Sequence, residues 1–405
     1  MSAAAELRPV SLQVADLRPV QPFRSRPEFD LLLACCADVS QSERIDRIRM
    51  ILSSPLDWQR LLHLAEHHGV IPQVYDKLSA LPDLADSQQL STLRSRYQHN
   101  ARKSLWFTGE LVRILQHLES LGIEALPYKG PALAELLYGD VTQRQFGDLD
   151  ILIHPAHVVR AKAALSDLEY QLAISLSGMQ EQAYIRSGYE YSFDGPRGRN
   201  LLEVQWRILP RFYSIDFEVA DFFEGADTVG LGGHTFRTLS AHDLVLVLCA
   251  HAAKHAWVRL SWLCDIAQLA KSEQLDWHAI QAEAGRLGIE RILAVTFLLA
   301  HKLLGSAIPH EIQNWLARDR TARTLAREIL PIIGRSRHYE TESIPYFRLM
   351  MRLRERWQDR MRFAWRLALT PSVGEWSVIR LPDSLFPLYR IVRCFRLGKR
   401  LALTR

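Results

Sequence analysis

Two aspartates, Asp148 and Asp150, stand one residue apart at the start of the apolar stretch "LDILIHP". The stretch predicts a β-strand, and alternate residues of a strand point to the same face, so the two carboxylates project together. Like charges this close repel each other, and a divalent cation such as Mg²⁺, which prefers hard oxygen ligands, would neutralise them. The alternative is a pair of solvated charges at a strand end.

A third acid, Glu203, lies in "LLEVQWRIL", on the same predicted strand face as Gln205 and Arg207. The residues between them are apolar and would form the opposite, buried face. A charged residue flanked by so much apolar sequence indicates a functional face. A third acid is also what a site for two metal ions would need.

The stretch "YKGPALA" places Gly130 between a predicted strand and a helix that carries Pro131 in its first turn. Backbone N–H groups and a helix N-terminus can approach a phosphate at such a place. Lys129 and Arg144 would add cationic contacts to a phosphate chain. Each feature is common by itself, and their order along the chain is what points to a metal and triphosphate site.

The elements that must position these residues change type along the chain. Residues 28–120 have the 3.6-residue apolar period of helices, including one that begins after Asp57 as N-cap and ends at Gly69. Between about 123 and 210 the pattern becomes β-α-β-α-β-β, which we take as the only strand-rich part of the chain. Helical periodicity returns after residue 240. The sequence therefore predicts an α+β fold, with a small mixed sheet and its helices flanked by helical N- and C-terminal regions.

The chain resembles the superfamily that contains DNA polymerase β and the aminoglycoside nucleotidyltransferases, and more closely a bacterial family of uncharacterised nucleotidyltransferases. The resemblance covers about 55–270 and rests on "KGPALAELLYGDVTQRQFGDLDILI", "LEVQWRI" and "LSAHDLVLVLCAHAAKHAWVRLSWLCDIAQL". It implies a nucleotidyltransferase palm in which Gly130 is the signature glycine, Asp148 and Asp150 bind metal, and Glu203 is the third acid. The implied cofactor is Mg²⁺ or Mn²⁺, with an NTP as co-substrate.

Two residues depart from the superfamily pattern. Pro131 follows the signature glycine and has no N–H to donate to a phosphate. Gln205 stands where relatives often carry a histidine. Neither change removes a metal ligand, but together they keep a second interpretation open, a catalytically weakened NTP-binding or scaffold protein with the same fold.

The helical block after the palm carries "HAAKHAW", with His251 and His255 one turn apart. The resemblance gives His251, Lys254, His255, Trp262 and Asp265 a role in closing the cleft over base or acceptor, with Lys254 and His255 near the nucleotide. The alternative is a polar contact between helices in which Asp265 pairs with one of the two histidines. A zinc-protease motif is excluded because Ala252 stands where that motif needs glutamate.

The composition is that of an ordinary globular protein, with 48% hydrophobic and 23% charged residues in 405. Five cysteines without a CxxC pair suit a reducing compartment, and no apolar run approaches the length of a membrane span. We therefore expect a cytoplasmic protein. We expect the chain to have five regions: a flexible leader at 1–27, a helical region at 28–120, the palm at 121–238, a helical domain covering the cleft at 239–335, and a basic helical region at 336–405.

The C-terminal 55 residues carry 13 Arg or Lys and 4 Asp or Glu, so their net charge is +9 while the rest of the chain carries −4. Such a segment can lie on an anionic membrane or on RNA. The alternative is a helix whose arginine stems cover the domain while their charged heads stay in water.

The predicted function is metal-dependent transfer of an NMP from an NTP to a hydroxyl of a small-molecule, saccharide or peptide acceptor. Asp148, Asp150 and Glu203 would bind metal and carry catalysis, with Glu203 able to act as general base. The residues expected to hold the nucleotide are Lys129, Gly130, Arg144, Lys254 and His255. A nucleic-acid acceptor is disfavoured because no duplex-binding motif is visible.

Overall fold

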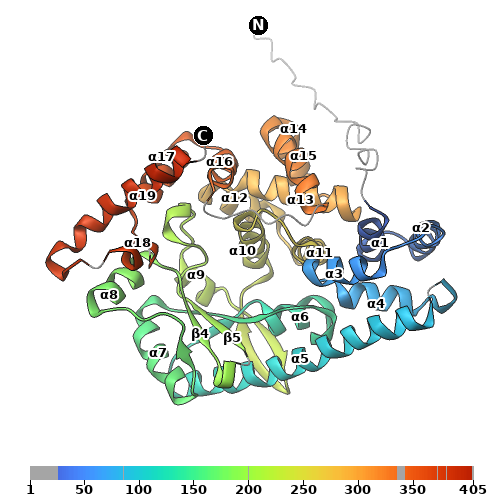
Figure 1. Cartoon of the computed structure of the whole chain (residues 1–405), viewed down its shortest axis with the longest axis horizontal. Coiled ribbons are helices and arrows are strands. Elements are labelled where there is room, and N and C mark those ends of the chain that lie inside the picture. The colour runs from blue at the N-terminus through green and yellow to red at the C-terminus, as the bar shows by residue number, and fades with distance from the viewer. Residues whose placement is uncertain are drawn as a thin grey trace, which may run out of the picture.

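The fold is described from a computed structural model, which covers residues 26–84, 86–198, 200–334, 343–371, 373–379 and 381–403. It has a mixed five-stranded sheet among many helices, which confirms the α+β class (Figure 1). The predicted flexible leader, apart from residues 26 and 27, lies outside the described residues. In the described part of the chain, no helix is both long and apolar enough to cross a membrane.

The N-terminal region is helical and ends in a long helix beneath the sheet (Figure 1). Its helices are α1 (Pro27–Cys36), α2 (Gln41–Leu52), α3 (Trp58–His68), α4 (Ile71–Ser79) and α5 (Ser87–Ser120). The Asp57 side chain accepts a hydrogen bond from the Arg60 amide, and Gly69 ends α3 at φ 70°, as the sequence predicted. Glycine adopts this left-handed conformation without the steric cost that a Cβ would add.

The five-stranded sheet has the order β1-β2-β5-β4-β3. Its strands are β1 (Ala125–Pro127), β2 (Asp148–Ile153), β3 (Gln171–Leu172), β4 (Glu190–Asp194) and β5 (Leu201–Gln205). Strands β2 and β5 are parallel, and the other neighbours are antiparallel. The helices within this region are α6 (Gly130–Tyr138), α7 (Val158–Asp167), α8 (Gly178–Ser187) and, just beyond it, α9 (Val219–Glu224).

One face of the sheet is an apolar core. Leu149, Ile151, Leu202 and Val204 are fully or almost fully buried there, in one cluster with apolar residues of α5 and α7. Each such side chain contributes about 1.5 to 3 kcal/mol by leaving water. This burial fixes which residues face the other way, because a strand alternates its side chains.

A second sheet corrects the prediction that only residues 123–210 are strand-rich. Strands β6 (Asp227–Leu231) and β7 (His234–Thr238) form a hairpin, and Gly232 and Gly233 make its turn with positive φ angles of 55° and 82°. A Gly-Gly pair between two alternating stretches is a hairpin signal, so the sequence did carry this information.

A second group of helices packs over the polar side of the sheet (Figure 1). It contains α10 (Ala241–Lys254), α11 (Leu260–Leu269), α12 (Trp277–Leu287), α13 (Glu290–Leu304), α14 (His310–Arg318) and α15 (Arg320–Gly334). Helix α13 is buried on almost all sides, which explains its continuous apolar stretch.

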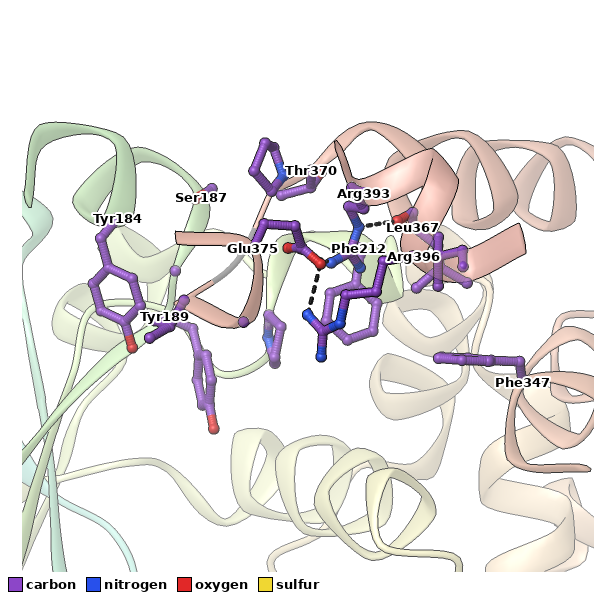
Figure 2. Close-up of a pocket in the computed structure, with 16 residues that line it drawn as sticks. Tyr184, Ser187, Tyr189, Phe212, Phe347, Leu367, Thr370, Glu375, Arg393 and Arg396 are labelled. Carbon is purple, nitrogen blue, oxygen red and sulfur yellow. Dashed lines mark hydrogen bonds and ion pairs between the residues drawn. The ribbon is translucent and has the colours of Figure 1, made fainter. Parts of the chain in front are cut away.

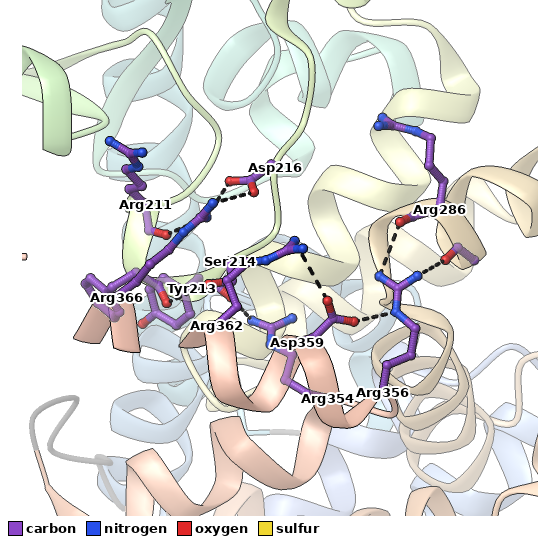
Figure 3. A network of polar contacts seen from close by, with 12 residues as sticks. Arg211, Tyr213, Ser214, Asp216, Arg286, Arg354, Arg356, Asp359, Arg362 and Arg366 are labelled. Atoms are coloured by element: carbon purple, nitrogen blue, oxygen red, sulfur yellow. Dashed lines mark hydrogen bonds and ion pairs between the residues drawn. The ribbon is translucent and has the colours of Figure 1, made fainter. Parts of the chain in front are cut away.

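The C-terminal helices are tied to the rest of the molecule by arginines (Figure 3). They are α16 (Ile344–Leu353), α17 (Trp357–Leu369), α18 (Val373–Val378) and α19 (Tyr389–Leu403). Arg366 binds both carboxylate oxygens of Asp216, at 2.7 and 2.9 Å, and Arg354 donates to the carbonyl of Tyr213 at 2.6 Å. These contacts join α17 and the segment before it to the loop that follows β5.

Two arginines of α19 do not follow the interpretation in which their heads stay in water, whereas Arg390 is exposed and fits it. Arg393 and Arg396 turn inward and pair with Glu375, at 3.1 and 2.7 Å. Apolar residues of the same helix face outward instead, with Ile391 52% and Phe395 75% exposed. The basic charge of the tail is thus partly used inside the fold.

Candidate active site

The polar face of the sheet and the helices α10 and α11 enclose a cavity of about 720 Å³. The structure brings all of the sequence-predicted site residues to its wall, which are Lys129, Gly130, Arg144, Asp148, Asp150, Glu203, Lys254 and His255. Residues that are separated along the chain thus lie together around one cavity.

The three acids come from adjacent parallel strands. Asp148 and Asp150 are the first and third residues of β2, and Asp150 lies directly opposite Glu203 of β5 in the strand register. Leu149 and Ile151 are buried on the far side of β2, so both aspartates must face the cavity.

A fourth acid, Glu190, lines the same cavity and was not predicted. It lies on β4 opposite Gln205, next to the strand that carries Glu203. Tyr191 and Phe193 point to the opposite face of β4 and are buried, so Glu190 faces the cavity. The alternation of "EYSFD" and the turn "DGPRGRN", which predicts that this strand pairs with the next one, held the signal, but Glu190 was not recognised in it.

The four carboxylates create an excess of negative charge in a partly buried place. Burial, together with the neighbouring Asp150 and Glu190, raises the pKa of Glu203 to about 9. Burial and Asp150 also raise the pKa of Asp148. A site whose acids resist ionisation in this way is one that a bound cation would stabilise.

Lys129 forms a buried ion pair with Asp150. Its Nζ donates to Oδ1 of Asp150 at 2.8 Å, and it is only 8% exposed. Burial alone would lower the pKa of the ammonium, but Asp150, Tyr128 and Glu203 outweigh burial and raise it. Lys129 is therefore a permanent positive charge between the acids and the start of α6.

Gln205 also binds the acids. Its Nε2 lies 3.3 Å from Asp150, 3.2 Å from Glu203 and 3.3 Å from Glu190, and its Oε1 accepts a hydrogen bond from the Tyr128 hydroxyl. A neutral amide at this position can contact all three carboxylates without adding charge.

Arg207 does not share the cavity face, contrary to the prediction. The amides of Trp206 and Arg207 both donate to the carbonyl of Tyr189, which is the pattern of a β-bulge. The Arg207 guanidinium is turned to backbone carbonyls of residues 185, 186 and 188. The extra residue of the bulge breaks the alternation on which the prediction relied.

Gly130 begins α6 with a φ of 53°. A Cβ at this position would lie 3.3 Å from the backbone carbonyl oxygen of Asp148. Two constraints therefore favour glycine here, the left-handed conformation and the close approach of β2. Pro131 follows in the first turn, where its missing N–H breaks no helical hydrogen bond.

Arg144 is held by Asp265, which corrects the pairing proposed between Asp265 and the histidines. Arg144 Nε donates to Asp265 Oδ2 at 3.0 Å, and the Tyr138 hydroxyl donates to Oδ1 at 2.9 Å. Arg144 and Asp265 are 6% and 1% exposed. This buried ion pair joins the loop before β2 to helix α11.

The histidines of α10 pack on an aromatic wall. His251 and His255 contact the ring of Trp262, with centroids 5.2 and 5.3 Å apart. Burial lowers the pKa of both imidazoles, to about 3 for His255, so they are neutral at physiological pH. Lys254 donates to the Tyr189 hydroxyl at 2.8 Å, and burial lowers its pKa.

The donor set fits a hard divalent cation in chemistry and charge. Asp148, Asp150, Glu190 and Glu203 offer carboxylate oxygens around one cavity, and burial together with repulsion between these acids raises the pKa of Glu203. Among the residues that the structure describes, no three potential ligands are gathered into a metal cluster in their present side-chain positions. Lys129 and Gln205 now bind the oxygens that a cation would take.

Comparison with known proteins identifies the family. The family model described as "uncharacterised nucleotidyltransferase" matches residues 54–305, well over half of the chain. No curated protein matches the sequence. Two solved structures of ANT(2'')-Ia overlap with it: a solution structure of this antibiotic-resistance factor, and a crystal structure with adenylyl-2''-tobramycin.

The overlap with ANT(2'')-Ia is distant. The identities are 14% and 12%, and the TM-scores are 0.34 and 0.33. Each alignment covers 44% of this chain, and 89% and 95% of the respective solved chain. A likeness this low carries no argument about activity.

Proposed function

We propose that this chain, which belongs to the family of uncharacterised nucleotidyltransferases and is an enzyme of that class, transfers an NMP from an NTP. The acceptor would be a hydroxyl group, and the reaction would depend on a metal ion. The observation that carries the proposal is the convergence of Asp148, Asp150 and Glu203 from two adjacent parallel strands on one cavity.

Asp148, Asp150 and Glu203 would hold Mg²⁺ or Mn²⁺, and Glu190 adds a fourth oxygen donor nearby. When bound, the metal would neutralise charge on the phosphates and on the acceptor oxygen. Glu203 is a candidate general base for the proton of the acceptor hydroxyl, because a bound cation would favour its ionised form.

The phosphates would lie between the start of α6 and Lys254. Gly130 begins the helix at the cavity wall, and Lys129 of the palm and Lys254 of α10 supply positive charge. Arg144 is fixed by Asp265, so its role would be to present a guanidinium in one orientation. Positioning and charge neutralisation supply most of the catalysis in phosphoryl chemistry.

The acceptor would be a small molecule, a saccharide or a peptide. The cavity volume of about 720 Å³ supports this size class, because small-molecule sites typically measure about 300 to 1,000 Å³. His255 and Trp262 would form the wall against which base or acceptor packs.

The C-terminal region offers a further contact surface. Trp357, Met361 and Trp365 recur every four residues along α17 and are 70%, 59% and 69% exposed. The stripe would suit peripheral contact with an anionic membrane, to which the exposed basic residues Arg362 and Arg390 would add attraction.

Two measurements test the proposed function together. Calorimetry with each NTP and Mg²⁺ or Mn²⁺ measures binding, and a screen of α-labelled NTPs against candidate acceptors measures transfer with pyrophosphate release. We expect metal-dependent binding and release. Binding without release for every acceptor would favour the catalytically weakened alternative, and no metal-dependent binding would refute the nucleotide site.

A further inference from the structure

A second cavity of about 340 Å³ lies where the palm meets the C-terminal helices (Figure 2). Its wall is mainly aromatic and aliphatic. From the palm come Tyr184, Tyr189 and Phe212, and from the C-terminal region come Phe347, Leu367 and Val373. This volume and lining are those of a site for one or two fused rings.

The second cavity adjoins the active-site cavity. Tyr189, Pro210 and Phe212 line both of them. Tyr189 is held from the active-site side, because Lys254 donates to its hydroxyl at 2.8 Å and lies over its ring at 4.5 Å. A molecule in the second cavity would thus rest against the same tyrosine that borders the catalytic acids.

The charges of the second cavity select against cations. Its charged lining residues are Glu375, Arg393 and Arg396, which sum to +1. The Glu375 carboxylate is shared by both guanidinium groups, at 3.1 and 2.7 Å (Figure 2). A polycationic acceptor would therefore meet repulsion here, whereas a neutral or anionic one would not.

The helices that close this cavity lie beyond the family match. Phe347, Leu367 and Val373 all follow residue 305, where the match ends. Arg354 and Arg366 fix α16 and α17 to the loop after β5 (Figure 3), and the ion pairs of Glu375 join α18 to α19. The shape of the cavity is a property that this chain adds to the shared catalytic core.

We propose that the second cavity is the acceptor subsite, and that it takes the apolar or aromatic part of a neutral or anionic hydroxyl compound. The proposal rests on the proposed function, because an acceptor is defined only if NMP transfer takes place. The acceptor ring would lie against Phe212 and Leu367, and its hydroxyl would pass Tyr189 into the active-site cavity.

The test uses product mimics that occupy both cavities. The 2-naphthylmethyl esters of AMP, CMP, GMP and UMP are compared by calorimetry with their parent nucleotides, in the presence of Mg²⁺. The matched cationic probes are the choline esters of the same nucleotides. The variants are Val373→Trp, which adds bulk at a residue that lines the cavity and is 38% exposed, and Val378→Trp, which places the same bulk on the same short helix at a residue that does not line it and is 64% exposed.

We expect a naphthylmethyl ester to bind the wild type and Val378→Trp at least about tenfold more tightly than its parent nucleotide. In Val373→Trp this gain should vanish while the parent nucleotide binds as before, which also shows that the variant is folded. The choline esters should gain nothing. A naphthylmethyl gain that survives in Val373→Trp, or a larger gain for the choline esters, would overturn the proposal.

Failure of the proposed function has a different signature. If no parent nucleotide binds, the nucleotide site itself is wrong. Ring binding in the second cavity is then measured by the fluorescence of 1-anilinonaphthalene-8-sulfonate, an aromatic anion. Displacement of this dye by 2-naphthylmethanol is followed in the same assay. Equal dye binding by the wild type and Val373→Trp would overturn the assignment of the cavity as a ring-binding site.

Discussion

Replacement of Gly130 by alanine isolates the contact between the start of α6 and β2. At φ 53° an alanine costs about 1 to 2 kcal/mol, because its Cβ crowds the backbone in the left-handed region. The new Cβ would also lie 3.3 Å from the carbonyl oxygen of Asp148, so this backbone must shift by a few tenths of an ångström. Small displacements of catalytic groups cost much in rate, and we expect roughly a tenfold loss of kcat.

Gly139 provides the matched control at the other end of the same helix. It has a φ of 64°, but a Cβ there would meet nothing within 4 Å. Both alanine variants should lower the thermal midpoint by about 1 to 2 °C, measured by calorimetry. Only Gly130→Ala should lose pyrophosphate release. Equal activity in the two variants would refute the view that the approach of α6 to β2 positions the site.

Three further predictions concern charge. The fold raises the pKa of Glu203 from 4.5 to about 9, so the metal-free protein should lose stability as the pH rises between these values. Glu203→Gln should remove on the order of 1 to 3 kcal/mol of that loss, measured by urea unfolding at pH 5 and pH 8. Arg144→Leu should cost about 3 to 5 kcal/mol of unfolding free energy by leaving Asp265 buried without its cation. Replacing Trp357 and Trp365 by glutamine should reduce sedimentation with anionic vesicles at least about fivefold.

Each of these three predictions has a control at an exposed position. Glu119→Gln, on the surface of α5, should leave the pH dependence of stability unchanged. Arg237→Ala breaks an ion pair whose side chains are about 40% exposed and should cost at most about 1 kcal/mol. Val159→Gln, 64% exposed on α7, should not change vesicle binding. Results equal to those of the controls would contradict the corresponding prediction.

The sequence predicted the elements of the sheet that carry chemistry, because apolar alternation is a local signal. Asp148, Asp150 and Glu203 followed from that alternation and from the resemblance. Glu190 was missed although the turn "DGPRGRN" predicts that its strand pairs with that of Glu203, because the resemblance points to three acids and gives no role to a fourth. Arg207 was assigned to the wrong face because a bulge, which local patterns do not reveal, interrupts the alternation.

Contacts between distant segments were the least predictable. The sequence could not show that Asp265 pairs with Arg144, since 121 residues separate them. The inward turn of Arg393 and Arg396 toward Glu375 was also missed, because basic residues at helical spacing look the same whether they face water or a buried carboxylate. The second cavity depends on these contacts of Glu375, because all three residues line it.

The central claim is that Asp148 and Asp150 carry metal-dependent NMP transfer. The most direct measurement is transfer from an α-labelled NTP by the Asp148→Asn/Asp150→Asn variant, beside the wild type, with Mg²⁺ and with Mn²⁺. We expect loss of transfer by at least about a thousandfold with an unchanged circular dichroism spectrum, because the amides keep the shape but lose the charge that binds metal. Full transfer by the double variant would contradict the claim.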